Sequence, residues 1–411
     1  MKSKVIWIFN QVASMLETRH LEIGKQFANH GYTCVVFTSS FHHGNHEYIF
    51  EDDITEIEKS TNVHFVYLKV KPSYNNNGLK RVLSFWGFNK KISKYSDFYV
   101  KKYGKPEYII ASSLPPLVWE EGYKIANKYN AKWIAEVKDF WPLQLTDIMG
   151  LPKWHPMVVF FGIIEKRAYK RSDAIVASMP YAYKYISEEL GFPKEKVYWM
   201  ANGISTKRVD ENLANPHIHI PKEIDEFLEK HWTCVYCGSL VKSESVPYIV
   251  SAFNYLENYQ DIYLAIIGSG HSEAEIKQAI IDNKLQDRVK MFPRVSYEQI
   301  PKILSKAKCC IAAVQDFSLY RYGLSMIKLN DYLYSGKPTI FACGYKNVVE
   351  EIDGLCIPYG NAKEIANKII EVKTYTNQQI EKLAEKQIQE IKKNYDYEQV
   401  GNRYLALLES L

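Results

Sequence analysis

The sequence has no hydrophobic run that approaches the length of a membrane span. The longest, "VVFFGII" at residues 158–164, is far shorter than the roughly 20 apolar residues that a transmembrane helix needs. The start, "MKSKVIWIFN", has five apolar residues before Asn10, which predicts a first β-strand rather than a signal peptide. Seven cysteines without a secretory segment then predict reduced thiols and a cytoplasmic protein.

Clusters that would hold a metal or a redox centre are also lacking. The pair "CVYC" at 234–237 has no second pair, and Cys309 and Cys310 are adjacent residues of a predicted strand, so buried thiols are the favoured interpretation. The stretch "SSFHHGNHE" at 39–47 offers three histidines, but no fourth zinc ligand is evident, and a polar loop is favoured. We therefore expect neither a metal nor a cofactor.

Positive charge is concentrated in one segment. Residues 69–105 hold ten Lys or Arg and one acid, a net charge of +9, whereas the whole chain carries +5. Such a local excess indicates a local anionic partner and not a protein that coats nucleic acid. Residues 79–102 mix aromatics with lysines, which suits either peripheral contact with an anionic membrane or an ordinary solvated helix. The residues expected at the membrane are Lys80, Arg81, Trp86, Lys90, Lys91 and Lys94.

Short β-branched runs alternate with amphipathic stretches in two blocks. This alternation predicts an α/β protein with two doubly wound parallel-sheet domains, at residues 1–202 and 203–372, followed by C-terminal helices at 373–411 that could cross back to the first domain. Ligands of such sheets bind beyond the carboxyl ends of the strands, so we expect a site in a cleft between the domains. The predicted strands are 4–9, 33–39, 63–70, 107–112, 132–137, 173–178, 196–201, 233–238, 262–268, 288–292, 309–314, 339–343 and 354–358.

Three strand ends of the second block carry candidate binding loops. "YCGSLVKS" at 236–243 and "IIGSGHSE" at 266–273 each lead from a strand through glycine and serine towards a helix, where backbone N–H groups could hold a phosphate. "MFPRVS" at 291–296 places Phe292 and Arg294 where a flat base could lie. Plain strand-to-helix turns and a surface arginine are the alternative for all three.

A fourth element, "YGLSMIKLNDYLYSGKPTI" at 322–340, predicts a helix with Ser325 as N-cap and Gly336 as its stop. Lys328 then lies in the first turn, where the helix dipole disfavours a cation. An anionic ligand at this helix start would remove that cost, and Asp331 would suit a sugar diol. Without a ligand, we expect Lys328→Gln to leave stability equal or to raise it.

Together, the four elements predict one nucleotide-diphosphate pocket. Its predicted residues are Gly238, Ser239, Lys242, Gly268, Ser269, Gly270, Phe292, Arg294, Gly323, Ser325, Lys328 and Asp331.

The stretch at 322–340 resembles the signature region of family-4 glycosyltransferases of the GT-B fold. It is most similar to a bacterial surface-polysaccharide subgroup that includes L-fucosamine (N-acetylfucosamine) transferases, with a pattern like "YGISPNKLFDYMAAGKP". "EVKDFWP" at 136–142 resembles "EVRDLWP", and "VYWMANGIS" at 197–205 resembles "VxWIPNGVD". "RHLEIGKQFANHGYTCVVFTSS" at 19–40 and "EKRAYKRSDAIVASMP" at 165–180 add to a resemblance that covers essentially the whole chain.

The resemblance implies a retaining, metal-independent transferase that moves a sugar from a nucleotide-diphosphate donor, a UDP-sugar, to a lipid-linked saccharide. The implied location is the cytoplasmic face of the membrane. Asp139 and Lys328 are the expected catalytic residues, and Arg19 and His42 are assigned to the acceptor side. Without a metal, helix N-termini and lysines must stabilise the leaving diphosphate. For Asp139, a helix cap before Trp141 and Pro142 is the structural alternative.

The chain also departs from the family pattern. Of the family's two glutamates, Gly323 takes the first place and Asp331 the second; Ser239 replaces an arginine, with Lys242 nearby. The loop "NQVASMLET" at 10–18 lacks the usual glycines. Two other functions stay open: a sugar-nucleotide 2-epimerase of the same architecture, and a non-catalytic, membrane-associated assembly partner.

Overall fold

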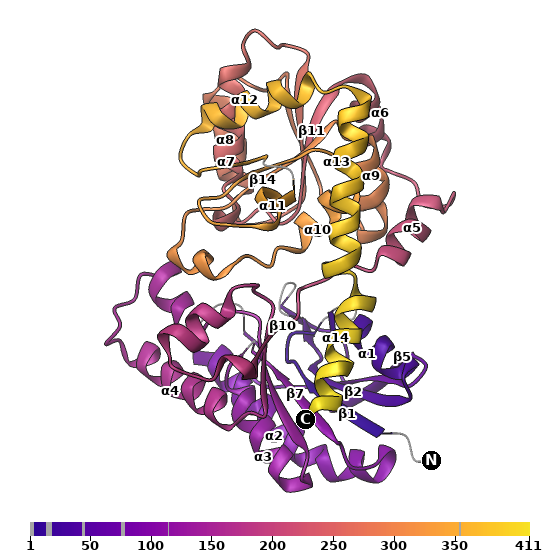
Figure 1. The fold of residues 1–411 in the computed structure, drawn as a ribbon, viewed down its shortest axis with the longest axis vertical. Helices are drawn as coiled ribbons and strands as arrows, with labels where there is room; N and C mark the ends of the chain where they lie inside the picture. Colours follow the sequence, from indigo (N-terminus) through magenta and orange to yellow (C-terminus); the bar gives the residue numbers. More distant parts are fainter. Residues whose placement is uncertain (1–3, 14–18, 43–45, 75–78, 114, 353–354) are drawn as a thin grey trace. The chain divides into compact units, whose positions relative to one another are not determined.

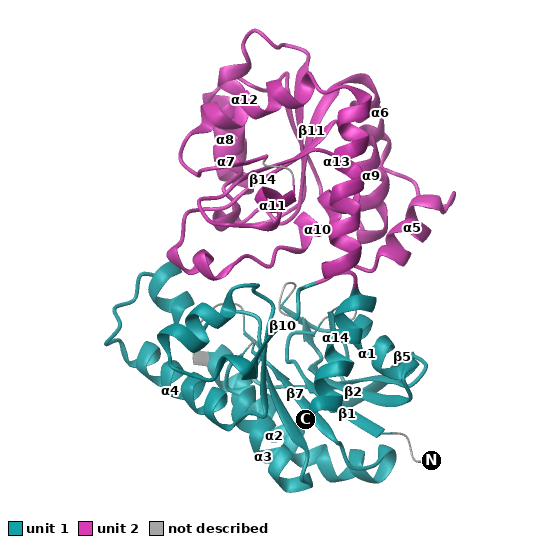
Figure 2. Cartoon of the chain, in the orientation of Figure 1, with its two compact units in different colours: residues 1–202, 397–411 teal, residues 203–396 magenta. Residues whose placement is uncertain are grey.

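The chain folds into two compact units (Figure 2). Unit 1 comprises residues 1–202 and 397–411, and unit 2 comprises residues 203–396. Unit 1 is thus made of two separate stretches of the chain, since its last helix follows unit 2. The structure is a computed structural model, and it describes residues 4–13, 19–42, 46–74, 79–113, 115–352 and 355–411.

Unit 1 is built on an eight-stranded sheet with the order β10-β9-β8-β7-β1-β2-β6-β5 within the described residues. The pairings are parallel except for that of β5 with β6. The central strands read as continuous apolar runs because helices cover both faces of a parallel sheet. The strands are β1 (Lys4–Phe9), β2 (Tyr32–Ser39), β5 (Ile54–Ser60), β6 (Val63–Leu68), β7 (Tyr108–Ser112), β8 (Lys132–Val137), β9 (Ala174–Ala177) and β10 (Val197–Trp199).

Three strands of unit 1 were not predicted. β5 has the sequence ITEIEKS, whose charges alternate with apolar residues, and it is only partly buried at the sheet edge. The hairpin of β3 (Phe41–His42) and β4 (Glu47–Tyr48) has two residues in each strand, too few to leave a pattern. His43 of the predicted histidine loop lies outside the described residues, as do residues 14–18 of the glycine-free loop.

The helices of unit 1 include the last one of the chain. α14 packs along α1, where the rings of Phe27 and Tyr404 are 5.9 Å apart (Figure 1). The α-helices are α1 (Arg19–Asn29), α2 (Leu79–Tyr103), α3 (Val118–Tyr129), α4 (Pro156–Arg171) and α14 (Tyr397–Ser410), and the short turns are η1 (Gln144–Ile148), η2 (Lys184–Glu189) and η3 (Lys194–Lys196).

Among the residues that the structure describes, unit 2 contains a six-stranded parallel sheet with the order β13-β12-β11-β14-β15-β16. The predicted strand at 354–358 starts at a position outside the described residues. The strands are β11 (Trp232–Cys237), β12 (Ile262–Ile267), β13 (Val289–Phe292), β14 (Cys309–Ala313), β15 (Thr339–Ala342) and β16 (Cys356–Ile357).

Most of the predicted C-terminal helical segment belongs to unit 2. α13 and η8 both contact α10 there, whereas α14 is part of unit 1. The elements are α5 (Thr206–Ala214), α6 (Lys222–Lys230), η4 (Lys242–Glu244), α7 (Val246–Ala252), η5 (Phe253–Leu256), α8 (Glu273–Asp282), η6 (Tyr297–Gln299), α9 (Ile300–Lys306), η7 (Ser318–Tyr322), α10 (Ile327–Tyr334), α11 (Val348–Ile352), α12 (Ala362–Lys373), α13 (Asn377–Glu390) and η8 (Ile391–Tyr395).

The start of α10 differs from the prediction. The helix begins at Ile327 with Met326 at the N-cap position and without a side-chain cap, so Ser325 is not its N-cap. Lys328 nevertheless lies in the first turn. The predicted stop is present, because Gly336 follows the helix with a φ of +68°. In the described part of the chain, no helix is both long and apolar enough to span a bilayer.

Candidate functional site

Two strand-end loops of unit 2 are joined by their backbones. The N–H groups of Gly238 and Leu240 donate to the carbonyl oxygens of Ile267 and Ser269, each at 3.0 Å. A Cβ on Gly268 or Gly270 would clash with the carbonyl oxygens of this neighbouring loop. The glycines thus serve the close approach of two backbones, and the loops at 236–243 and 266–273 converge as predicted.

Lys328 of α10 reaches the first of these loops. Its Nζ lies 2.6 Å from Glu244 Oε2 and donates to Tyr236 Oη at 2.8 Å. It also lies 4.6 Å from the centre of the Tyr236 ring, a cation–π contact. A Cβ on Gly238 would be 2.7 Å from this ammonium group. Burial lowers the pKa of Lys328, and the charge of Glu244 opposes that shift.

Glu244 changes the interpretation of Lys328. The lysine side chain is 13% exposed and the glutamate 16%, so this ion pair is largely withdrawn from water. From the sequence alone, a bound anion was needed to explain why Lys328 lies in the first turn. In the structure, the carboxylate of Glu244 takes the place of that anion. The expectation that Lys328→Gln would not lower stability is therefore revised, because the change would leave Glu244 without its cation.

A second internal carboxylate occupies the glycine loop. The backbone N–H of Gly270 donates to Glu273 Oε1 at 3.0 Å, at the start of α8. The ammonium group of Lys328 and the N–H of Gly270, both expected to bind a phosphate, thus already interact with carboxylates of the chain. Neither glutamate was singled out from the sequence, although Glu244 stands two positions after Lys242 and Glu273 three after Gly270.

Asp331 lies on α10 one turn after Lys328. Its Oδ1 accepts a hydrogen bond from Tyr297 Oη at 3.0 Å, and the guanidinium of Arg208 lies 4.8 Å from the Tyr297 ring. Burial raises the pKa of Asp331 to about 7, although the hydrogen bond from Tyr297 and the charge of Arg208 act in the opposite direction. Asp331 is thus a partly buried carboxyl group that titrates near neutral pH.

The neighbouring Tyr332 fixes α10 to the end of β11. Its hydroxyl accepts from the N–H of Cys237 at 2.7 Å and donates to the carbonyl oxygen of the same residue at 3.0 Å. Tyr332 is completely buried. This double hydrogen bond holds α10 against the end of β11, and Lys328 one turn earlier meets Glu244 of the loop that follows this strand.

Phe292 is not a platform for a base. It is 3% exposed and packs against Phe227, with ring centres 5.5 Å apart, so this part of the prediction is wrong. The sequence pattern could not separate an aromatic at a strand end from one that closes the core. Arg294 is exposed, as are Ser239, Lys242 and Ser269. Gly323 is buried with a φ of +97°, and Ser325 is partly buried.

Asp139 of unit 1 lies two positions after the end of β8. Burial raises its pKa to about 6, and the charge of Lys138 and hydrogen bonding by Gln144 oppose this shift. The next helical turn, η1, has Leu143 at its N-cap position and no side-chain cap, so the structure gives Asp139 no capping role there. Asp139 combines partial burial with a perturbed pKa, two properties that are common among catalytic carboxylates.

Arg19 does not fit the acceptor role assigned from the sequence. Its side chain is 3% exposed, and Nε donates to Glu136 Oε1 at 2.9 Å. The other guanidinium nitrogens donate to the carbonyl oxygens of Met200 and Ala201. All three nitrogens therefore bind groups inside unit 1, and the arginine is part of its core.

Glu136 is the centre of this buried network. Besides Arg19, it accepts from Tyr404 Oη at 2.7 Å, and its Oε2 lies 2.7 Å from His20 Nε2. Burial alone would raise the pKa of Glu136, but the charges of His20 and Arg19 hold it well below its usual value. The network joins β8 to α1 and α14. The sequence showed Glu136 within "EVKDFWP" but gave no sign of its partners.

His42 lies in β3 and is partly buried opposite Glu47 of the hairpin. Its assignment to the acceptor side stays a prediction.

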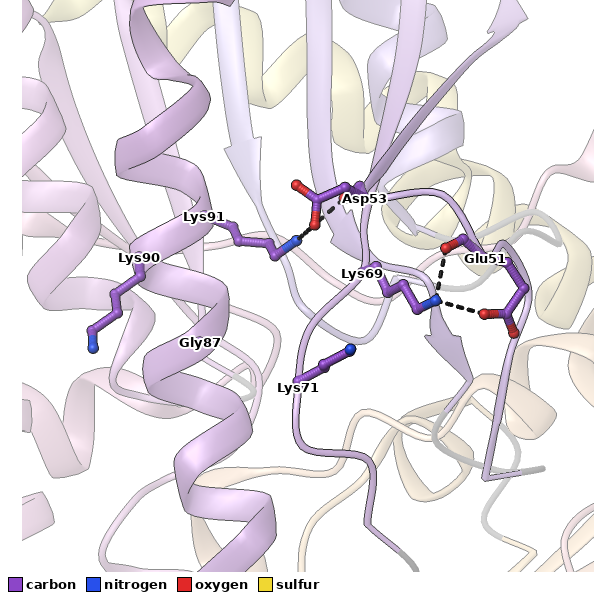
Figure 3. Close-up of a pocket in the computed structure, with 7 residues that line it drawn as sticks. All are labelled: Glu51, Asp53, Lys69, Lys71, Gly87, Lys90 and Lys91. Atoms are coloured by element: carbon purple, nitrogen blue, oxygen red, sulfur yellow. Dashed lines mark hydrogen bonds and ion pairs between the residues drawn. The ribbon is translucent and has the colours of Figure 1, made fainter.

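Two of the lysines predicted to touch a membrane, Lys90 and Lys91, line a pocket of unit 1 (Figure 3). In this pocket of about 500 Å³, Lys91 is ion-paired with Asp53, and Lys69 with Glu51 at 2.6 Å. Lys94 also lies 3.4 Å from Asp53. Part of the positive charge of residues 69–105 is therefore neutralised by Glu51 and Asp53, which precede this segment in the chain. Lys80, Arg81, Trp86 and Lys90 lie on the same helix, where Lys80, Trp86 and Lys90 are exposed.

Two family models match the chain, one in each half. The model described as glycosyl transferases group 1 matches residues 221–394, and the model of glycosyltransferase family 4 matches residues 16–208. These two matches support a glycosyltransferase. A curated relative, an uncharacterized glycosyltransferase of Haemophilus influenzae, is 24% identical over 178 residues. This match covers 41% of the chain, and the chain spans about half the length of that relative.

Solved structures establish the fold. Sucrose-phosphate synthase from Thermosynechococcus elongatus is similar with a TM-score of 0.75 at 15% identity, over 99% of this chain and 98% of that chain. HepE of Anabaena, solved with UDP and glucose, is similar with a TM-score of 0.68 at 13% identity, over 99% and 100%. The chain thus has the GT-B fold, as predicted.

Proposed function

We propose that this protein transfers a sugar from a nucleotide-diphosphate donor, a UDP-sugar, to a lipid-linked saccharide. The product would enter a bacterial surface polysaccharide such as a capsule, an O-antigen or an exopolysaccharide. Retention of the anomeric configuration and independence of a metal belong to the same proposal. The resemblance to L-fucosamine transferases makes a UDP-linked N-acetylated amino sugar the first donor to test.

One observation carries the donor side of this proposal. Lys328 at the start of α10 lies against the joined loops after β11 and β12, a place suited to a diphosphate. A cation beside exposed backbone loops is the electrostatic arrangement that stabilises a leaving diphosphate. Solved relatives with the same fold, such as HepE of Anabaena, carry UDP in their structures, which supports a nucleotide-sugar donor.

We assign distinct roles to three residues. Lys328 would stabilise the leaving phosphate after exchanging Glu244 for it. Asp331 would accept hydrogen bonds from the ribose, a role for which its two oxygens are suited. Asp139 would act as a base or as a hydrogen-bond partner of the sugar or acceptor, which its raised pKa supports.

Incubation of the purified protein with a panel of UDP-sugars, with and without a lipid-linked saccharide, tests this function. Release of UDP that requires the acceptor, together with a glycosylated lipid detected by mass spectrometry, is the expected result. Conversion of the donor to an epimer without any acceptor would instead identify a 2-epimerase. Absence of both reactions for every donor would favour the non-catalytic assembly partner.

The proposal places the protein at the cytoplasmic face of the membrane, because a lipid-linked acceptor resides there. The sequence offered residues 79–102 as the contact with anionic lipid. If this segment carries the contact, replacement of Lys90, Lys91 and Lys94 by Glu abolishes sedimentation with anionic vesicles at low salt.

A further inference from the structure

Helix α4, labelled in Figure 1, and the loop before it carry several exposed apolar side chains in unit 1. Trp154 is 78% exposed, Met149 60% and Ile163 52%. Soluble monomers rarely leave large contiguous apolar patches in water, and such patches mark interaction sites. We call this feature the α4 surface; it consists of Met149, Trp154, Met157, Val159, Phe160 and Ile163, all of them exposed.

The helix is apolar on two faces. Its inner face buries Val158, Phe161, Ile164 and Ala168, and α4 contacts α3. A helix that is hydrophobic all round is normally enclosed by its own protein, yet here the outer face stays in water. The apolar run "VVFFGII" at 158–164 supplies both faces. Packing within unit 1 therefore explains why the buried residues of this run are apolar, but not why the exposed ones are.

The charges beside the α4 surface are positive. Lys153, Lys166 and Lys170 are exposed, and the structure gives none of them an ion-pair partner within the described residues. The acids of residues 144–171 are Asp147 and Glu165, and Glu165 is 1% exposed. Exposed Trp and Phe beside unpaired lysines are the side chains that favour the interface of an anionic bilayer. A second copy of the chain would set like charges against each other.

α2 fits a membrane less well. Its exposed Leu83 and Trp86 are one turn apart, but Phe98 lies twelve positions further on, about 18 Å along the helix axis, so the three do not form one compact patch. Lys91 and Lys94 already face Asp53.

We propose that the α4 surface docks unit 1 onto an anionic lipid bilayer, with Trp154 and Phe160 among the acyl chains and the lysines at the headgroups. This inference rests on the membrane part of the proposed function. It is tested by binding alone, so that its failure and a failure of the transferase activity can be told apart.

The test uses the full chain and vesicles of phosphatidylcholine with or without phosphatidylglycerol. We expect co-sedimentation with the anionic vesicles, weaker at high salt because exposed charges are screened. Phe160→Ser combined with Ile163→Ser should lower the partition coefficient by about tenfold or more, since burial of such side chains contributes at least that much. Lys166→Gln with Lys170→Gln should weaken binding to anionic vesicles by about tenfold or more.

The matched control replaces exposed apolar residues of α2, Leu83→Ser with Trp86→Ser, and should leave binding unchanged. All altered side chains are exposed, and thermal melts check that each variant is folded. A second readout is quenching of tryptophan fluorescence by lipids with brominated acyl chains, which Trp154→Phe should reduce while circular dichroism stays the same.

Three outcomes would overturn the proposal. The first is wild-type protein that binds neither kind of vesicle. The second is loss of binding in the α2 control with full binding in the α4 variants, which would return the membrane contact to residues 79–102. The third is self-association of the wild type in sedimentation velocity that Phe160→Ser with Ile163→Ser abolishes without vesicle binding, which would make a second copy the occupant.

Discussion

Each unit places a carboxylate against a cation near the end of a parallel strand, but the two pairs differ in their access to water. In unit 1, Glu136 and Arg19 are 1% and 3% exposed, and backbone carbonyls and Tyr404 saturate the pair. In unit 2, Glu244 and Lys328 are 16% and 13% exposed, and beside them lies the loop that carries the exposed Ser239. An ion pair that is buried and has all its hydrogen bonds satisfied has a structural role. A partly exposed ion pair can be separated by a ligand that binds one of its two charges.

The largest effect should come from breaking the buried pair. Glu136→Gln leaves the guanidinium of Arg19 without its counter-charge inside the core, which typically costs about 3–5 kcal/mol. We expect chemical denaturation to show a loss of this size. Glu107→Gln is the control, because Glu107 pairs with Lys4 at 3.4 Å in an exposed position and should contribute less than about 1 kcal/mol. A loss below about 1 kcal/mol for Glu136→Gln would remove the contrast between the units.

Opening the partly exposed pair should affect catalysis more than folding. Lys328→Gln should lower single-turnover rates by about 10²–10³, the usual effect of losing one preorganised electrostatic group. Its stability should fall as well, because Glu244 loses its partner. A variant that melts much lower but turns over normally would make Lys328 structural, like Arg19.

Glu244→Gln is the matched variant of the same pair. It keeps the lysine charge and removes the internal competitor, so UDP should bind more tightly, by up to about tenfold, in calorimetric titrations. Weaker binding of UDP would mean that Glu244 orients the lysine instead of competing with the ligand.

Substitution of Asp139 tests whether unit 1 contributes to the transfer reaction without binding the donor. Its pKa of about 6 predicts that turnover falls as pH drops below 6, because the carboxylate becomes protonated. Asp139→Asn should lose this limb of the pH profile and at least about tenfold in turnover, while calorimetry shows unchanged affinity for UDP. Full turnover in Asp139→Asn would exclude the proposed role.

The smallest effect concerns Asp331. Its folded pKa of about 7 lies above the ordinary value of 3.8, so the folded state holds an extra proton between these values and stability declines as pH rises through that window. Asp331→Asn should therefore melt at an equal or higher temperature than the wild type above pH 7, with a smaller difference near pH 5. It should weaken binding of UDP but barely affect free diphosphate. Equal losses for both ligands would argue against a ribose contact.

The sequence was most informative where a local pattern decides the outcome. Alternation of strands and helices predicted both sheets, and the glycines of "CGSL" and "IGSG" predicted two loops that meet. It was least informative about partners distant in the chain. Glu136 meets Tyr404 across 268 positions, and Lys328 meets Tyr236 across 92. No spacing rule relates such residues, since helix and strand periods reach only a few positions.

The sequence by itself determined the α/β class and the first-turn position of Lys328. Tertiary structure alone decided which of the predicted site residues are accessible to a ligand. It turned Phe292 and Arg19 into core residues and gave Lys328 an internal carboxylate, while it left the outer face of α4 in water. The physical reason is that burial and ion pairing depend on what packs around a side chain, and in a doubly wound fold those neighbours come from strands and helices far apart in sequence.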